Sequence, residues 1–151
     1  MNIEIQAPDL TQRPPRSPRT RLGGYALLPR MLDKGRATLA GKNGEYHYAC
    51  PLDQRLLEFL GLEPEPLKSE LATGAGDGEI LAWIQANQKK RNTPAEIAVW
   101  SASMDNREPD DGESKEFFDE LLRAAAPSRT DVKTWSELLD LDDYVSFGGK
   151  A

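Results

Sequence analysis

The chain contains one cysteine and one histidine in 151 residues, and this scarcity restricts its chemistry. Because Cys50 has no second cysteine to pair with, the chain forms no internal disulfide and does not require an oxidising compartment. With only Cys50 and His47, it also lacks the ligands of an ordinary structural zinc site, so we expect no metal centre. Long apolar runs are missing as well: none approaches the roughly 20 residues of a membrane span.

The first ten residues carry acids and lack both the basic and the apolar segment of a signal peptide. Together with the missing span, this predicts a soluble, cytoplasmic protein without membrane contact. A length of 151 residues suits one domain that buries about two-thirds of its unfolded surface.

Charge is distributed unevenly along the chain. The net charge is −6, yet residues 1–50 hold eight Lys and Arg against four Asp and Glu, while the remainder carries −10. An acidic protein is a poor nucleic-acid binder, because attraction to phosphates dominates that affinity. The basic N-terminal third predicts instead a small anion or an acidic protein as partner. The alternative is that its charges pair with the acidic remainder and with solvent.

Residues 1–21 form a segment rich in proline and arginine, with prolines at positions 8, 14, 15 and 18. Such a composition favours extended or irregular backbone. We therefore expect an N-terminal arm that is less ordered than the body, followed by one helical domain over residues 22–151.

Proline and glycine mark the ends of successive predicted helices. Pro29 is placed to open a helix that Gly41 ends, and Pro51 to open one that Gly61 ends. Gly35 lies on the apolar side of the first of these, where a neighbouring element can approach closely. The expected helices cover residues 29–40, 51–60 and 65–73, a stretch with Asp77 as N-cap, a stretch from residue 94, the region from residue 117 to about 126, and a stretch from residue 135.

Two of these helices begin with a capping box, at Thr93–Glu96 and at Thr134–Glu137. Trp83, Trp100 and Trp135 fall on apolar helix faces and are expected in the core. Alternating patterns typical of strands are weak, with residues 2–6 and 45–49 the only candidates. The prediction is an all-α fold, a single compact domain of six or seven short helices.

Two blocks, LGGYALLPRMLDKGRATLAGKNGEYHYACPLD and the terminal TWSELLDLDDYVSFGGKA, resemble a family of small bacterial proteins known only as a domain of unknown function. The similarity covers nearly the whole chain after about Arg16. It implies a bacterial, soluble, single-domain protein, and it transfers no activity, substrate or catalytic residue.

Cys50 and His47 are the candidate catalytic residues. Cys50 precedes Pro51 at a predicted helix N-terminus, where free N–H groups and the helix dipole favour a thiolate. His47, three residues earlier, could serve as its base. The alternatives are a structural cysteine, which packs as a small hydrophobe, or a carboxylate-rich metal site that uses His47, Asp53 and Asp33.

The first predicted helix carries a dense set of charges. Arg30, Asp33 and Lys34 share one face at helical spacing, with Arg36 nearby. One interpretation is a solvated face with a local ion pair from Asp33 to Arg30 or Arg36. The other is an anion-binding face, in which Arg30 or Lys34 meets a carboxylate or phosphate. The remaining members of this candidate binding site are Tyr46, Tyr48 and Asp53.

Two functions remain open on these residues. The leading hypothesis is a non-catalytic helical binding or interaction module, since no catalytic constellation is recognisable. The alternative is a small enzyme or anionic-ligand-binding protein that uses the region from Arg30 to Asp53. The two differ in geometry, because only the second should bring Arg30, His47 and Cys50 or Asp53 around one concave, partly solvated cavity. The short connection after the first helix predicts that Arg30, Lys34, His47 and Cys50 approach one another.

Overall fold

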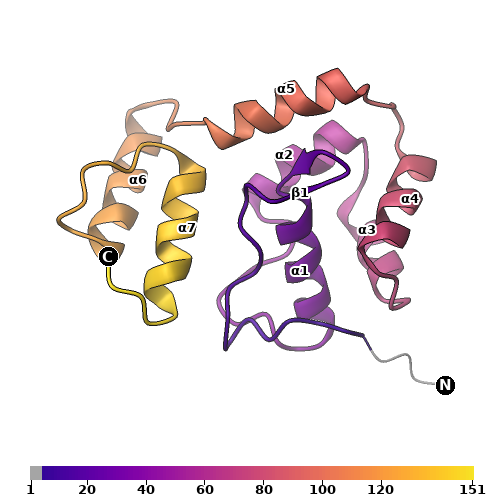
Figure 1. Ribbon diagram of the computed structural model, residues 1–151, viewed down its shortest axis with the longest axis horizontal. Coiled ribbons are helices and arrows are strands. Elements are labelled where there is room, and N and C mark those ends of the chain that lie inside the picture. The colour runs from indigo at the N-terminus through magenta and orange to yellow at the C-terminus, as the bar shows by residue number, and fades with distance from the viewer. Residues whose placement is uncertain (1–4) are drawn as a thin grey trace.

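The computed structural model describes residues 5–151, which fold into a mostly helical single domain with seven helices and one small hairpin (Figure 1). This agrees with the predicted all-α class and helix number. The elements are β1 (Arg21–Leu22), β2 (Tyr25–Ala26), α1 (Leu28–Leu39), α2 (Pro51–Leu60), α3 (Pro64–Leu71), α4 (Asp77–Asn87), α5 (Pro94–Asp105), α6 (Gly112–Ala125) and α7 (Trp135–Ser146).

Most helix ends follow the local signals, with exceptions at the starts of α4 and α6: α6 begins at Gly112 with Asp111 as its N-cap, before the predicted residue 117. Gly61 ends α2 in a left-handed conformation, and the capping boxes at Thr93 and Thr134 open α5 and α7. The prediction that Asp77 caps α4 is wrong, because Gly76 is the N-cap and Asp77 is the first helical residue. The Asp77 carboxylate instead accepts hydrogen bonds from two arginines.

The β1–β2 hairpin is absent from the sequence-based prediction. Its two-residue turn, Gly23–Gly24, has positive φ at both positions, the backbone that a tight hairpin turn requires. The strands are only two residues long, too short for an alternating pattern to reveal them. Ser101 of α5 fixes the hairpin, since its hydroxyl accepts from the Ala26 amide at 3.0 Å and donates to the Gly24 carbonyl at 2.8 Å.

The structure describes one of the two segments expected as strands in full, and only a small part of the other. Residues 45–49 form turns and coil rather than a strand, so that expectation is wrong. Most of the other candidate, residues 2–6, lies outside the described residues.

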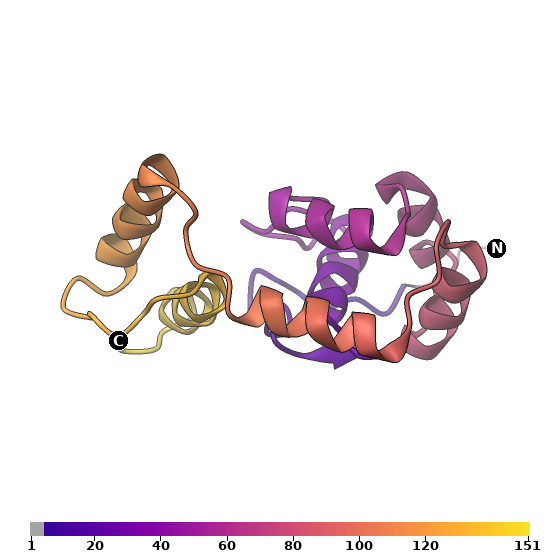
Figure 2. The ribbon, with the colours of Figure 1, turned by 90° about the horizontal axis from the view of Figure 1, so that it is seen from above.

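Helix α1 runs through the centre of the molecule and is buried on every side from Leu28 to Ala37 (Figures 1 and 2). Gly35 shows why its neighbours come so close: a Cβ at this position would lie 2.6 Å from Leu71 Cδ1 of α3. The close approach predicted for Gly35 is confirmed. A helix buried all round normally carries apolar residues throughout, so the charges on α1 need internal partners.

The buried apolar side chains form two separate clusters. The first joins the hairpin with helices α1 to α5, and the second joins α6, α7 and the segment between them. Figure 2 shows α6 and α7 at one end of the molecule, connected to the rest through α5. The three tryptophans, expected in the core, are partly buried at its margins: Trp83 and Trp100 pack against the first cluster and Trp135 against the second.

The N-terminal arm lies against the body. From residue 5 to residue 20 it contains no helix or strand, as its prolines predict. Leu10 is nonetheless fully buried, and its amide donates to the Lys42 carbonyl at 2.8 Å. Pro15 and Pro18 are buried as well. These contacts favour a docked arm over the loosely ordered arm that composition predicts.

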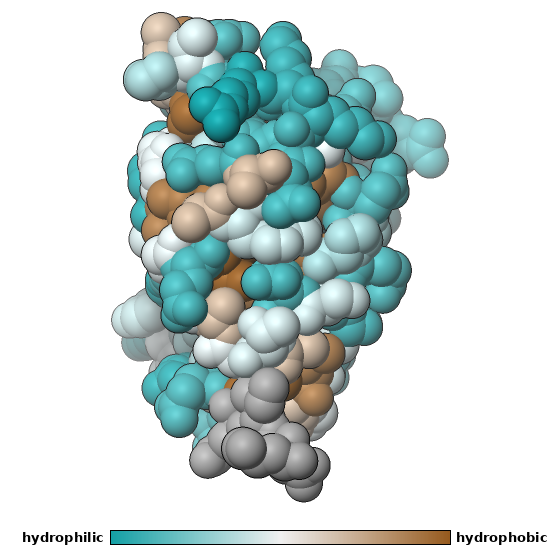
Figure 3. All heavy atoms as spheres, turned by 90° about the vertical axis from the view of Figure 1, so that its right-hand side faces the viewer, coloured by the Kyte–Doolittle hydropathy of each residue, from teal (hydrophilic) through white to brown (hydrophobic). Residues whose placement is uncertain are grey.

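The surface differs between the two ends. The face over α3 and α4 is mainly hydrophilic, with apolar side chains in small separate patches (Figure 3). Among residues 5–151, the large apolar side chains that are most exposed cluster elsewhere: four of five lie on α6, on α7 or directly after α7, and the fifth is Val99. Within the described residues, no helix is long and apolar enough to cross a membrane.

Candidate functional site

Arg30 of α1 forms a buried ion pair with Asp143 of α7. Its guanidinium donates to both Asp143 carboxylate oxygens, at 2.8 and 3.3 Å, and only 4% and 8% of the two side chains are exposed. The Tyr46 hydroxyl donates to the same carboxylate at 2.7 Å. Burial and this contact with Asp143 both raise the pKa of Tyr46, so the phenol remains a hydrogen-bond donor. The trio connects the two apolar clusters.

Lys34, one turn further along α1, pairs with Asp53 of α2. Its ammonium lies 2.8 Å from Asp53 Oδ2, and both side chains are at least 95% buried. The same ammonium donates to the sulfur of Cys50 at 3.3 Å. Asp53 also accepts from the Ala49 amide at 3.0 Å, which helps to hold Ala49 at a φ of 61°. Such a left-handed conformation is costly for a residue with a side chain, and it orients the start of α2.

Asp33 and Arg36 project to another side of α1. Asp33 accepts two hydrogen bonds from the Arg16 guanidinium, and Arg36 donates to Asp77 at 2.7 Å. Arg16 also donates to Asp77, and the hydrogen bonds from Arg16 and Arg36 lower the pKa of the Asp77 carboxyl. The predicted local pair between Asp33 and Arg30 or Arg36 is therefore wrong, because every charge on α1 has a partner distant in sequence.

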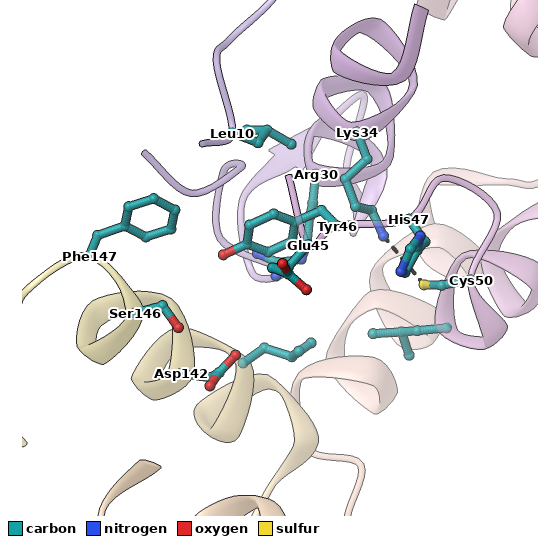
Figure 4. A pocket seen from close by; sticks show the side chains of 12 residues that line it. Leu10, Arg30, Lys34, Glu45, Tyr46, His47, Cys50, Asp142, Ser146 and Phe147 are labelled. Atoms are coloured by element: carbon teal, nitrogen blue, oxygen red, sulfur yellow. Dashed lines mark hydrogen bonds between the residues drawn. The ribbon is translucent and has the colours of Figure 1, made fainter. Parts of the chain in front are cut away.

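A cavity of about 440 Å³ opens between the loop before α2 and helix α7. Figure 4 shows Arg30, Lys34, Tyr46, His47 and Cys50 around it. The predicted approach of Arg30, Lys34, His47 and Cys50 is confirmed. It arises because Gly41 and Gly44, both with positive φ, turn the chain from the end of α1 back towards the start of α2. We call this space the polar cavity.

The other predicted site residues lie away from the polar cavity. The Tyr48 hydroxyl donates to the Pro64 carbonyl at 2.7 Å, and the ring packs beside Gly35. Burial raises the pKa of Tyr48, which keeps it a neutral phenol. Asp53 is buried beneath Lys34, and Asp33 and Arg36 face the arm. His47 is exposed and, among the described residues, makes no hydrogen bond to Cys50; the group that contacts the thiol is Lys34.

Helix α7 supplies the wall that sequence reasoning missed. Leu139, Asp142, Ser146 and the following Phe147 all line the polar cavity (Figure 4). Burial and the neighbouring charge of Asp143 raise the pKa of Asp142. The sequence signal that could have indicated this wall is the adjacent pair Asp142–Asp143, because two neighbouring acids on a partly apolar helix require separate partners. Nothing local assigns one of them to Arg30.

A second, more apolar cavity of about 470 Å³ adjoins the first. Cys50, Leu52, Leu139 and Asp142 line both, so the two cavities share a wall. We call this space the apolar cavity. It lies between α2, α6 and α7, and its remaining lining residues are Pro51, Arg55, Arg107, Ser114, Phe117, Leu121, Trp135 and Leu138.

Metal binding finds no support in the described part of the chain, since no three His, Cys, Asp or Glu side chains group there as a metal site would require. His47 and Asp53, two of the residues considered for a carboxylate-rich site, differ in burial: the first is exposed and the second is 1% exposed in an ion pair.

Residues 12–145 match the model of a protein family described as a domain of unknown function, DUF5069. The match covers most of the chain, which therefore belongs to this family. No curated protein matches the chain.

Proposed function

We propose that this protein binds a small amphipathic organic molecule in the polar and apolar cavities, without chemical conversion. The observation that carries the proposal is the shared wall of Cys50, Leu52, Leu139 and Asp142. Each cavity has the volume of a typical small-molecule site. Charged side chains line both cavities, and the apolar cavity adds a wall that is mainly carbon, so a molecule with two unlike ends fits this pair of cavities.

The charges of the polar cavity do not favour the small anion expected there. Arg30 and Lys34 are each paired with a buried carboxylate, Asp143 and Asp53. An incoming anion would compete with partners that are already well placed, and it would leave a buried carboxylate without a counter-ion. If an anionic group binds in the two cavities, it must therefore meet cations other than Arg30 and Lys34.

Binding of Nile red, an uncharged dye that fluoresces in apolar surroundings, tests the proposal. We expect the native protein to bind the dye and Leu139→Trp to weaken binding strongly, because a larger indole at this shared wall takes space from both cavities. Val99→Trp is the matched control, since Val99 is 72% exposed on α5 and lies outside both cavities. Equal binding by native protein and Leu139→Trp would remove the proposal, provided both melt at similar temperatures.

A reactive Cys50 thiol is the second candidate function, and the Lys34 contact at 3.3 Å favours it. A lysine ammonium and a helix N-terminus both stabilise a thiolate. The test is alkylation with iodoacetamide, which attacks the only cysteine. At pH 7 the folded protein should react faster than the same protein in urea. Reaction only after unfolding would show that Cys50 is a packing residue, and the enzyme hypothesis would lose its nucleophile.

A cytoplasmic location in a bacterium belongs to the same proposal. Its support is the single cysteine, which calls for no oxidising compartment, and the resemblance to small bacterial proteins. Cell fractionation with an antibody against the protein tests the location directly.

A further inference from the structure

We infer that the ligand is a single-chain amphiphile with one anionic head: its chain occupies the apolar cavity, and its head meets Arg55 and Arg107. This inference rests on the proposed function and specifies its ligand class. It also moves the predicted anion contact from α1 to the arginines of the apolar cavity.

The lining of the apolar cavity favours a hydrocarbon chain. Most of its wall is aliphatic or aromatic, and two members of that wall remain open to solvent, Phe117 with 55% and Leu121 with 41% exposed. A chain laid against them would remove apolar surface from water, which is favourable at about 25 cal/mol per Å². A space of about 470 Å³ suits one such chain and is small for a peptide helix.

The charges of the same cavity favour an anionic head. Among residues 5–151, Arg55 forms no ion pair and no side-chain hydrogen bond, and it is exposed on α2. Within the described part of the chain, Arg107 pairs only with Asp110, whose side chain is 65% exposed. This surface pair is weak, and the Arg107 guanidinium keeps free donors. Ser114, on the same wall, adds a hydroxyl. A carboxylate suits this set, because arginine donates two parallel hydrogen bonds to it.

Asp142, the one carboxylate that lines the apolar cavity among residues 5–151, belongs to the wall shared with the polar cavity. Together with Glu45 it makes the polar cavity the place where a cationic head would go instead. A head of either charge is thus a distinct and measurable outcome.

Three probes with the same chain separate these outcomes, each titrated by displacement of Nile red: dodecanoate and dodecyltrimethylammonium below their micelle concentrations, and dodecanol below its solubility limit. We expect dodecanoate to bind roughly tenfold more tightly than dodecanol, and the ammonium to bind most weakly. Added salt should weaken dodecanoate binding and leave dodecanol unchanged.

Arg55→Glu is the decisive variant, and Arg91→Glu is its control, because Arg91 is also exposed and lies in neither cavity. Arg55→Glu should abolish the roughly tenfold difference in affinity between dodecanoate and dodecanol. Arg91→Glu should leave both affinities unchanged. Dodecanoate no tighter than dodecanol, or tightest binding of the ammonium, would overturn the anionic head and leave the proposed function standing. Displacement by none of the three, with Nile red equally bound by Leu139→Trp, would reject the proposed function itself.

Discussion

The body, which we define as the hairpin with helices α1 to α5, and the α6–α7 pair differ in the size of their apolar cores. Among the described residues, the apolar cluster of the body has thirteen fully or nearly fully buried members, three of them on α1 itself, whereas the cluster around α6 and α7 has five. The body therefore has a core of its own. The α6–α7 pair is connected to the body through α5 and through polar contacts. The chief contacts are the Arg30–Asp143 ion pair and the hydrogen bond from the Trp135 amide to the Arg107 carbonyl.

This difference explains where the cavities lie. Two apolar clusters that merged would leave no space between them, because protein interiors pack closely. Here the polar contacts keep α7 beside the body while α2 and α6 stay apart, and the apolar cavity occupies the region between them. The proposed ligand position thus lies at the seam between the two apolar clusters, the larger around α1 and the smaller around α6 and α7. Perturbing either side should affect the two units differently.

The largest effect is expected at the ion pair across the seam. Arg30→Met leaves the buried Asp143 carboxylate without its counter-ion, which should lower the free energy of unfolding by roughly 3–5 kcal/mol. Urea denaturation measures the loss. The double variant Arg30→Met/Asp143→Leu should recover most of it, since both charges are then gone. A loss below about 1 kcal/mol in the single variant would contradict the role of this pair.

Trp100→Ala should weaken the body by a smaller amount. Its indole stacks on Phe59 with ring centroids 4.8 Å apart, but the side chain is only partly buried. We expect a loss of roughly 2–3 kcal/mol, below that for a fully buried aromatic residue. Val99→Ala, at an exposed position of the same helix, is the control and should change stability by less than about 0.5 kcal/mol. Equal losses would place Trp100 outside the core.

Acid should act with opposite sign at two carboxyl groups, Asp77 in the body and Asp142 on α7. The hydrogen bonds from Arg16 and Arg36 lower the pKa of Asp77 in the body, so this stabilisation is present above the ordinary value of 3.8 and is lost as pH falls through the lower folded value. The pKa of Asp142 is raised, so its contribution is complete below 3.8 and is lost as pH rises through the higher folded value.

Two variants separate these contributions in urea melts between pH 2 and pH 6. Asp77→Asn should remove part of the acid sensitivity, by roughly 0.5–1 kcal/mol for partly exposed ion pairs. Asp142→Asn should make the protein slightly more stable near pH 6 and no more stable near pH 3. Unchanged pH profiles in both variants would show that these carboxyl groups do not control acid stability.

The smallest effect is expected at Trp135 in the α6–α7 unit. Its indole Nε1 is buried and, among the described residues, has no hydrogen-bond acceptor. Trp135→Phe removes this unsatisfied donor, which should stabilise the fold, and part of the indole packing, which should destabilise it, while it keeps the aromatic contact with Phe118. The two effects on the free energy of unfolding should nearly cancel, to within about 0.5 kcal/mol. Trp100→Phe, which removes part of the stacked pair with Phe59, should cost about 1 kcal/mol. A larger loss for Trp135→Phe would indicate an acceptor at Nε1.

Much of the fold could be predicted because its signals are local. Gly61 ends α2, and the capping boxes at Thr93 and Thr134 open α5 and α7, since the groups involved are within three residues of each other. The site was predictable in part. The turn after α1 brings Lys34 to Cys50, but the opposite wall on α7 comes from residues about a hundred positions away.

The sequence by itself determined the helical class, most of the helix ends and the cluster of Arg30, Lys34, His47 and Cys50 at one place. Only the tertiary structure decided what their charges do. On an isolated helix, Arg30 and Asp33 are neighbours at i and i+3; in the fold, α1 is central and each charge meets a different element. Local spacing cannot specify these partners, because a buried charge is satisfied by whichever opposite charge the packing of distant helices brings within reach.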